Sequence, residues 1–196
     1  MMPMLQLDLM REFSDLCYGM IHRDGLKELM KWIADSDFST APASTRFHGN
    51  YAGGLLEHSL NVYHALKQLV SLHTIDVSEE SIAIVALFHD LCKANYYTES
   101  TRNVKDEDTG KWIKVPYYTV NDQFPVGHGE KSVIILQGFI KLTDEEIYAI
   151  RWHMGGFDSA VKGGDFSLSK AYESCPLAVL LHLADMTATY LMEARN

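Results

Sequence analysis

Four side chains that can bind a metal ion fall within segments that are otherwise apolar. His58 lies in a core-facing row of a predicted helix, His89 and Asp90 end a long apolar run, and Asp185 has scarcely a polar neighbour. An unpaired carboxylate in such surroundings is costly, and metal coordination would compensate for it. Imidazole with carboxylate is a usual ligand set for Fe, Mn, Co, Ni or Zn.

Two further histidines are expected at helix ends, where side chains point into clefts. His128 opens one predicted helix and His153 closes another. Each residue alone has a structural alternative: His58 as a hydrogen-bonded core histidine, Asp185 as the partner of Arg151, and the other two histidines as ordinary helix-end residues. Their combination in the most apolar helices of one small domain favours a metal site.

Apolar residues at helical spacing predict the elements that would position these side chains. Ser78 is a good helix start, and Thr143 with Glu146 forms a capping box. The stretch 36–51, rich in Ser, Thr, Pro, Gly and Asn, is expected to be a loop. Helices are predicted over residues 4–21, 26–33, 53–72, 81–91, 143–154 and 177–188.

One region breaks the helical pattern. Asp108-Thr109-Gly110 separates strand-like runs at 102–105 and 111–120, which predicts an inserted β-hairpin over about residues 96–120. The aromatic residues around it could stack on a base or could simply pack the hairpin onto the domain. These are Tyr96, Tyr97, Trp112, Tyr117 and Tyr118. The glycine-rich segment 155–170 is expected to be a long loop near the site.

Composition narrows the class of protein. A chain of 196 residues fits one domain spanning 1–196, with N-terminal helices over 1–35 and a metal-binding core over 45–190. The formal net charge of −9 makes a long nucleic acid an unlikely partner and favours a small phosphorylated molecule, because bound metal ions would reverse the local charge.

The compartment and assembly follow less directly from the residues. Three widely spaced cysteines indicate reduced thiols in a cytoplasmic protein. Met1-Met2-Pro3-Met4 has no basic region or cleavage site, so no signal peptide is expected, and no apolar run reaches a membrane-spanning length. A homo-oligomer is possible.

Taken together, these residues resemble the H…HD…D signature of HD-domain proteins. The resemblance rests on Gly-Gly-Leu-Leu-Glu-His-Ser at 53–59, Leu-Phe-His-Asp-Leu-Cys-Lys at 87–93 and the run 180–185, and it covers roughly residues 45–190. The first run is similar to the HD domain of a bacterial 3′–5′ exoribonuclease, although no nucleic-acid-binding module is expected here. Cyclic-di-GMP phosphodiesterases carry a GYP motif that this chain does not have. Cys92 stands where most members have glycine.

The resemblance implies an all-α fold, an HD-domain helical bundle, with His58, His89, Asp90 and Asp185 as metal ligands. Members with two ions add two histidines between the HD pair and the last Asp, and His128 and His153 occupy those places in order. The expected cofactor is therefore a divalent transition metal, with two ions, among Fe, Mn, Co, Ni and Zn, and Mg possible.

The implied activity is metal-dependent hydrolysis of a phosphomonoester or phosphodiester, with a nucleotide as the expected substrate. Asp90 would bridge two ions that activate a hydroxide. Lys93 would bind a phosphoryl oxygen, or it is a solvated helix-end lysine. Lys131 is a second candidate for substrate binding, or an exposed helix lysine, and His48 could reach the site from its loop.

Two alternatives remain open at this stage. The same six ligands in the same order occur in mixed-valent di-iron oxygenases of the superfamily, and the ligands alone do not separate the two chemistries. A non-catalytic nucleotide-binding protein would also keep the fold. His22, His64, His73 and His182 are interpreted as structural.

Overall fold

The centre of the fold is α4 (Glu79–Phe88) in the computed structural model, which describes residues 4–193. Every side chain from Ile82 to Phe88 is buried, as the apolar run predicts, and the Ser78 side chain accepts a hydrogen bond from the Ser81 backbone at the start of the helix. The helix ends at Phe88, three residues before the predicted end at residue 91, and His89 caps it.

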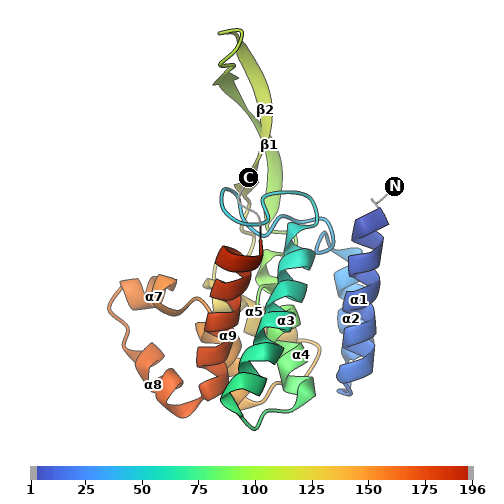
Figure 1. Ribbon diagram of the computed structural model, residues 1–196, viewed down its shortest axis with the longest axis vertical. Helices are drawn as coiled ribbons and strands as arrows, with labels where there is room; N and C mark the ends of the chain where they lie inside the picture. The colour runs from blue at the N-terminus through green and yellow to red at the C-terminus, as the bar shows by residue number, and fades with distance from the viewer. Residues whose placement is uncertain (1–3, 194–196) are drawn as a thin grey trace.

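α3 (Gly54–His73) lies beside α4 (Figure 1), and α6 (Asp144–Trp152) also packs directly against α4. α9 (Pro176–Thr187) packs against both α3 and α6. The predicted capping box at the start of α6 is present, with Thr143 and Glu146 bonding each other's backbone. The apolar runs of the sequence therefore meet in one core.

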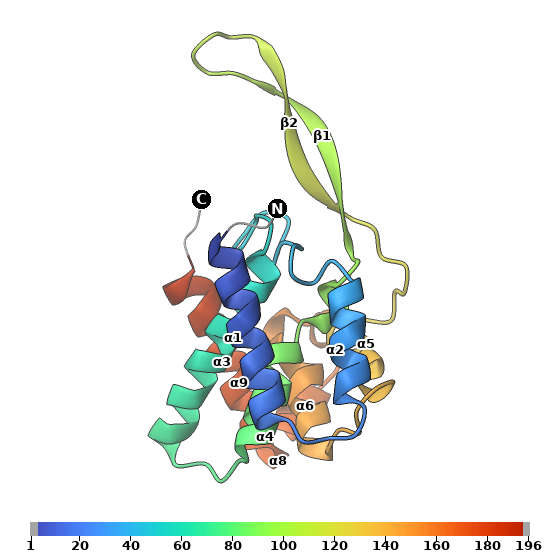
Figure 2. The same cartoon turned by 90° about the vertical axis from the view of Figure 1, so that its right-hand side faces the viewer.

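The N-terminal helices cover one side of this core (Figure 2). α1 (Met4–Met20) packs on α3 and α4 through buried residues such as Phe13, and α2 (Leu26–Asp35) follows it. Residues 36–53 contain no helix or strand, as expected for a loop. Residues 1–3 and 194–196, which the sequence analysis included in the predicted domain, lie outside the described part of the chain.

Beyond α4 the chain makes a short turn, η1 (Leu91–Lys93), against which α5 (His128–Gln137) packs. The expectation of a long loop over 155–170 was wrong. Asp158 caps the one-turn helix α7 (Ser159–Lys162) by accepting a hydrogen bond from the Ala160 backbone. Two further helical segments lie in or next to this stretch: η2 (Gly155–Phe157) and α8 (Ser167–Ser174).

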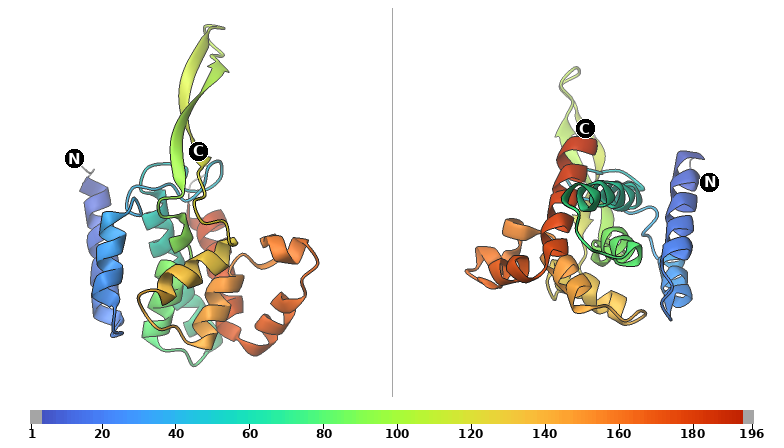
Figure 3. Two further views of the ribbon diagram at one scale, coloured as in Figure 1. Left: turned by 180° about the vertical axis from the view of Figure 1, so that it is seen from behind. Right: turned by 60° about the horizontal axis from the view of Figure 1, so that its bottom comes forward.

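The inserted hairpin is present and projects from one end of the helical domain (Figures 1 and 3). β1 (Tyr97–Lys105) pairs antiparallel with β2 (Trp112–Val120) from Tyr97↔Val120 to Lys105↔Trp112. β1 begins five residues before the predicted start. Its first residues carry no apolar alternation, because most side chains on both faces of the strand are exposed.

The C-terminal end of the described chain returns to the same end as the hairpin (Figure 1). α9 continues into a π-helical turn, η3 (Ala188–Met192), which packs against α3 and leads to Glu193. Within residues 4–193 no single helix has the length and apolarity needed to cross a bilayer. Only α8 joined to α9 and η3 passes that test by length and composition, as a pair bent by 107°.

Candidate metal centre

Three elements bring the first group of donor atoms together. His58 lies on α3, His89 caps α4 and Asp185 lies on α9. His58 Nε2 is 3.3 Å from His89 Nε2 and 3.3 Å from Asp185 Oδ1. Two ring nitrogens and a carboxylate oxygen thus face one point, a geometry suited to a metal ion.

Asp90 connects this group to a second group of donor atoms, which comes from His128 and His153. Asp90 Oδ1 lies 2.7 Å from His128 Nε2 and 3.6 Å from His153 Nε2. Its other oxygen, Oδ2, lies 3.6 Å from His58 Nε2 and 3.5 Å from His89 Nε2. Each oxygen of this buried carboxylate therefore faces a different pair of histidines, which is the arrangement a bridging ligand needs.

The ring orientation of two histidines follows from the ends of their helices. His89 Nδ1 lies 2.8 Å from the Ala86 carbonyl, and His153 Nδ1 lies 2.7 Å from the Ile150 carbonyl. Carbonyls in the last turn of a helix have no partner within the helix, so each accepts from the histidine three residues later. Nδ1 then carries the proton and Nε2 is left as the unprotonated donor atom.

The donor set fits a divalent metal on its own chemistry. His153 Nε2 is buried and has no hydrogen-bond partner among the described residues, although it faces Asp90. A buried, unpaired nitrogen is costly unless something fills the space before it. Neutral imidazoles and carboxylates are ligands that first-row transition metals accept.

Charges in the cluster are strongly coupled. Burial alone would raise the pKa of Asp90, but the charges of Lys93 and His89, the hydrogen bond from His128 and the nearby His153 ring hold it well below its usual range. Burial alone would lower the pKa of His58, but hydrogen bonds with Asp185 and Glu193 raise it to about 10. The Asp90 carboxylate is therefore ionised although it is buried.

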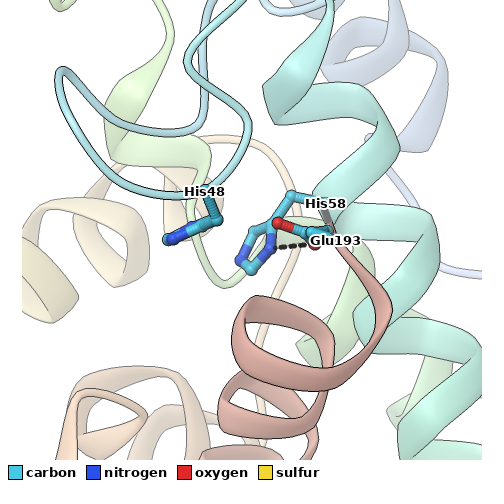
Figure 4. Close-up of side chains that lie close together, drawn as sticks. All are labelled: His48, His58 and Glu193. Carbon is cyan, nitrogen blue, oxygen red and sulfur yellow. Dashed lines mark hydrogen bonds and ion pairs between the residues drawn. The ribbon is translucent and has the colours of Figure 1, made fainter. Parts of the chain in front are cut away.

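Glu193 is a member of this cluster that the sequence analysis missed. Its Oε1 lies 2.8 Å from His58 Nδ1, and its side chain is only 1% exposed (Figure 4). Burial would raise the pKa of Glu193, whereas its bond to His58 lowers it overall. The residue lies beyond the last apolar helix, in a segment without periodicity, so only the folded structure reveals it.

The three candidate substrate-binding residues lie in different settings. His48 reaches the centre, with its ring centroid 4.7 Å from that of His58, and both its nitrogens are buried without a partner among the described residues. Lys93 Nζ lies 2.6 Å from Asp90 Oδ2. Lys131 is 8% exposed and bonds Asp122 at 2.6 Å, so the alternative of an exposed helix lysine was wrong.

A pocket of about 860 Å³ opens over the cluster. Its walls come from the loop 36–53, the base of the hairpin, the segment 154–162 and the end of α9 with η3. Lys131 is not among the lining residues, and neither is Trp112, which is 71% exposed at the last pair of the hairpin. The charged, imidazole and aromatic residues that line it include Arg46, Phe47, His48, Asp90, Lys93, Tyr96, Tyr97, His128, Phe157, Lys162, His182 and Asp185.

Other structural alternatives are also decided by the contacts. Arg151 pairs with Glu130 and Asp158, so it does not neutralise Asp185 as one alternative held. His182, interpreted as structural, lines the pocket while its Nδ1 bonds the His153 carbonyl at 2.7 Å.

Cys92, which stands at the glycine position of most HD motifs, is buried next to the cluster. Its Sγ lies 3.3 Å from His128 Nδ1, and its backbone N–H bonds the Ser132 hydroxyl. Burial raises the pKa of this thiol to about 12, so it remains protonated at neutral pH.

Comparison with known proteins agrees with the fold. The HD-domain family model matches residues 55–190, most of the chain, and the protein belongs to the HD-domain family. Over 71 residues the chain is 38% identical to the dihydroneopterin 2′,3′-cyclic phosphate phosphodiesterase of Methanocaldococcus jannaschii. That alignment covers 33% of this chain and 28% of the relative. No solved structure matches the chain significantly.

Proposed function

We propose that this protein is a metal-dependent phosphohydrolase that cleaves a small phosphorylated molecule, with a nucleotide-like phosphodiester as the favoured substrate. The observation that carries the proposal is Asp90, whose two oxygens face two pairs of histidines at the base of the pocket. Membership of the HD-domain family and the likeness to a phosphodiesterase support hydrolysis over oxygen chemistry.

The first ion would be held by His58, His89, Asp90 and Asp185, and a second by Asp90, His128 and His153, according to the distances between their donor atoms. When bound, the ions would polarise the phosphoryl group and lower the pKa of water. Lys93 would turn from Asp90 to a phosphoryl oxygen once the carboxylate has metal partners. His48, which is neutral because burial lowers its pKa to about 4, would donate a hydrogen bond to the substrate.

The aromatic side chains at the base of the hairpin would receive the organic part of the substrate. Tyr96 and Tyr97 line the pocket with their ring centroids 5.0 Å apart, and Phe157 lines it from the segment after α6. Aromatic faces stack on planar heterocycles such as nucleobases or pterins. A 2′,3′-cyclic phosphate is the first substrate to test, because the relative acts on one.

Metal stoichiometry tests the centre directly. Elemental analysis of protein purified without oxygen or chelators should give two ions per chain, falling to about one in a His128→Ala/His153→Ala variant. Asp90→Ala should lose both metal and turnover, because the carboxylate contacts both groups of donors. One ion or fewer in the wild type, unchanged in the double variant, would overturn the two-ion assignment.

Activity assays separate the two chemistries of the superfamily. The metal-loaded protein should release phosphate or open a cyclic phosphate without consuming O₂. Oxygen uptake by the anaerobically prepared iron form, with no phosphoester cleavage by any metal form, would instead favour the oxygenase.

A further inference from the structure

His58 differs from the other histidines of the centre in where it stands on its helix. His89 and His153 follow the ends of α4 and α6, and each bonds a last-turn carbonyl through Nδ1. His58 lies inside α3, where the carbonyl three residues earlier belongs to Leu55. That carbonyl already accepts a hydrogen bond from the Ser59 hydroxyl at 3.0 Å. The helix therefore offers no free carbonyl to orient the His58 ring.

Glu193 supplies the missing acceptor from the other end of the chain. Its Oε1 lies 2.8 Å from His58 Nδ1 and 3.3 Å from Asn61 Nδ2, one turn further along α3. The π-helical turn η3 ends just before this residue, and the Glu193 backbone N–H bonds the Ala188 carbonyl, which fixes the position of the carboxylate. Figure 4 shows Glu193 on one side of the His58 ring and His48 on the other.

We propose that Glu193 is a positioning residue for the metal centre. It accepts the Nδ1 proton of His58 in a hydrogen bond and so directs Nε2, which gives up its own proton when a metal binds, toward Asp185, His89 and Asp90. A carboxylate behind a metal-bound imidazole fixes which nitrogen is free and makes that nitrogen a stronger ligand. The inference rests on the proposed metal site, which assigns His58 as a ligand.

Glu193 is itself kept out of the ligand set by its position behind the ring. His58 Nε2 faces Asp185 and His89, whereas Glu193 meets the opposite nitrogen. One nitrogen each of His48 and His58 and one Glu193 oxygen do lie within 4.8 Å of one another, so a metal bound at His58 Nδ1 is the alternative that the tautomer of His58 must exclude. The carboxylate acts through His58 and does not touch the reacting atoms.

Co²⁺ titration of the full chain, followed by absorption, tests the proposal. Glu193→Ala should bind Co²⁺ about 10- to 100-fold more weakly than the wild type, the usual effect of removing such a partner. Glu193→Gln keeps an acceptor oxygen of the same shape and should fall between the two. Glu12→Ala is the matched control, because it removes a carboxylate from an exposed histidine, His64, at 2.7 Å outside the centre, and it should bind as the wild type does.

A second readout reports the tautomer itself. In ¹⁵N NMR of the Zn²⁺-loaded wild type, His58 should carry its proton on Nδ1 and bind metal through Nε2. Glu193→Ala should show loss or exchange of that Nδ1 proton. Wild-type Co²⁺ affinity in both Glu193 variants, or a metal-bound Nδ1 in the wild type, would overturn the proposal. If Glu193→Ala fails to fold, Glu193→Gln carries the same test.

Parallel titration of His58→Ala separates this inference from the proposed function. Wild-type Co²⁺ affinity in His58→Ala would mean that the metal centre itself is wrongly assigned. Weaker Co²⁺ binding by His58→Ala, with wild-type Co²⁺ binding by Glu193→Ala, would support the metal centre and contradict only the proposed role of Glu193.

Discussion

Arg46 is a cation at the pocket that has no other evident task. It is exposed, lines the pocket from the loop 36–53 and forms no ion pair with another described residue. In a protein of net charge −9, such a cation would attract an anionic substrate. We predict that Arg46→Gln raises KM for a phosphoester several-fold and leaves kcat nearly unchanged, as steady-state kinetics would show. Lys31→Gln, an exposed cation on α2, is the control, and an equal effect there would contradict a local role.

The pH dependence of stability tests the setting of His48. Burial, with the nearby charge on His58 and Lys93, lowers the pKa of His48 to about 4 from a usual 6.5. Between these values the unfolded chain binds more protons than the folded chain, so this residue reduces stability as pH falls from 6.5 to 4. His48→Gln lacks the effect. We predict that the variant gains on the order of 1–2 kcal/mol relative to the wild type between pH 7 and 4.5.

Urea unfolding of both proteins at a series of pH values, without added metal, measures this difference. All other titrating groups are common to the two chains, so the difference reports His48 and its immediate contacts. A difference that does not change with pH would mean that His48 is not held neutral by burial.

The ligand candidates could be predicted from the sequence because they are polar residues in apolar runs. His58, His89, Asp90 and Asp185 all lie at buried or partly buried positions of the core helices or at their ends. Glu193 could not be predicted in this way. It follows a π-helical turn beyond the last predicted helix, and its proposed role depends on a contact with a residue 135 positions earlier.

At the scale of elements, the hairpin is mostly independent of the domain beneath it. Its strands pair with each other along nine residues, but only the base of the hairpin reaches the pocket, through Tyr97 and Val120. Both faces of the distal part are largely exposed. The hairpin could be predicted from the turn residues between two strand-like runs, whereas the start of β1 was missed because its mostly exposed side chains show no apolar alternation.

Shortening the hairpin should therefore leave the centre intact. Replacing residues 101–116 with Asn-Gly joins Ser100 to Tyr117, which already pair, through a turn that suits antiparallel strands. We predict a change in Tm below about 3 °C and unchanged Co²⁺ affinity, because few contacts of the domain are lost. Calorimetry and metal titration would check this.

Tyr97→Ala provides the contrast at the base of the hairpin. This residue lines the pocket, and its hydroxyl lies 3.4 Å from the Ala43 carbonyl. The Tyr97→Ala substitution should weaken substrate binding, although it removes far fewer atoms than shortening the hairpin does.

For the shortened hairpin, a large loss of Tm would contradict the prediction and show that the distal part of the hairpin stabilises the domain.

At the scale of the whole molecule, segments far apart in sequence meet at one end of the helical core. The loop 36–53, the base of the hairpin and the chain around η3 all lie at this end (Figures 1 and 2). The candidate ligands come from the core helices and their ends, and most of the pocket wall comes from these segments. A rigid core can thus hold the metal donors while the surrounding segments set which molecule enters.

The N-terminal helices are joined to that core by a buried ion pair. Arg23, between α1 and α2, meets Glu146 of α6 through two hydrogen bonds of 2.6 Å, and the Glu146 side chain is fully buried. Ser81 of α4 bonds the same carboxylate. Removing Arg23 would leave Glu146 charged and buried without its cation, which is strongly destabilising.

We predict that Arg23→Ala lowers the free energy of unfolding by about 3 kcal/mol, because the pair is mostly shielded from water. Lys67→Ala is the matched control: it breaks an ion pair with Glu79 of 2.9 Å whose side chains are 41% and 57% exposed, and it should cost less than about 1 kcal/mol. Urea unfolding of the metal-free variants gives both values. Similar losses in the two variants would mean that the N-terminal helices are held by apolar packing alone, and that Arg23 adds little to their attachment.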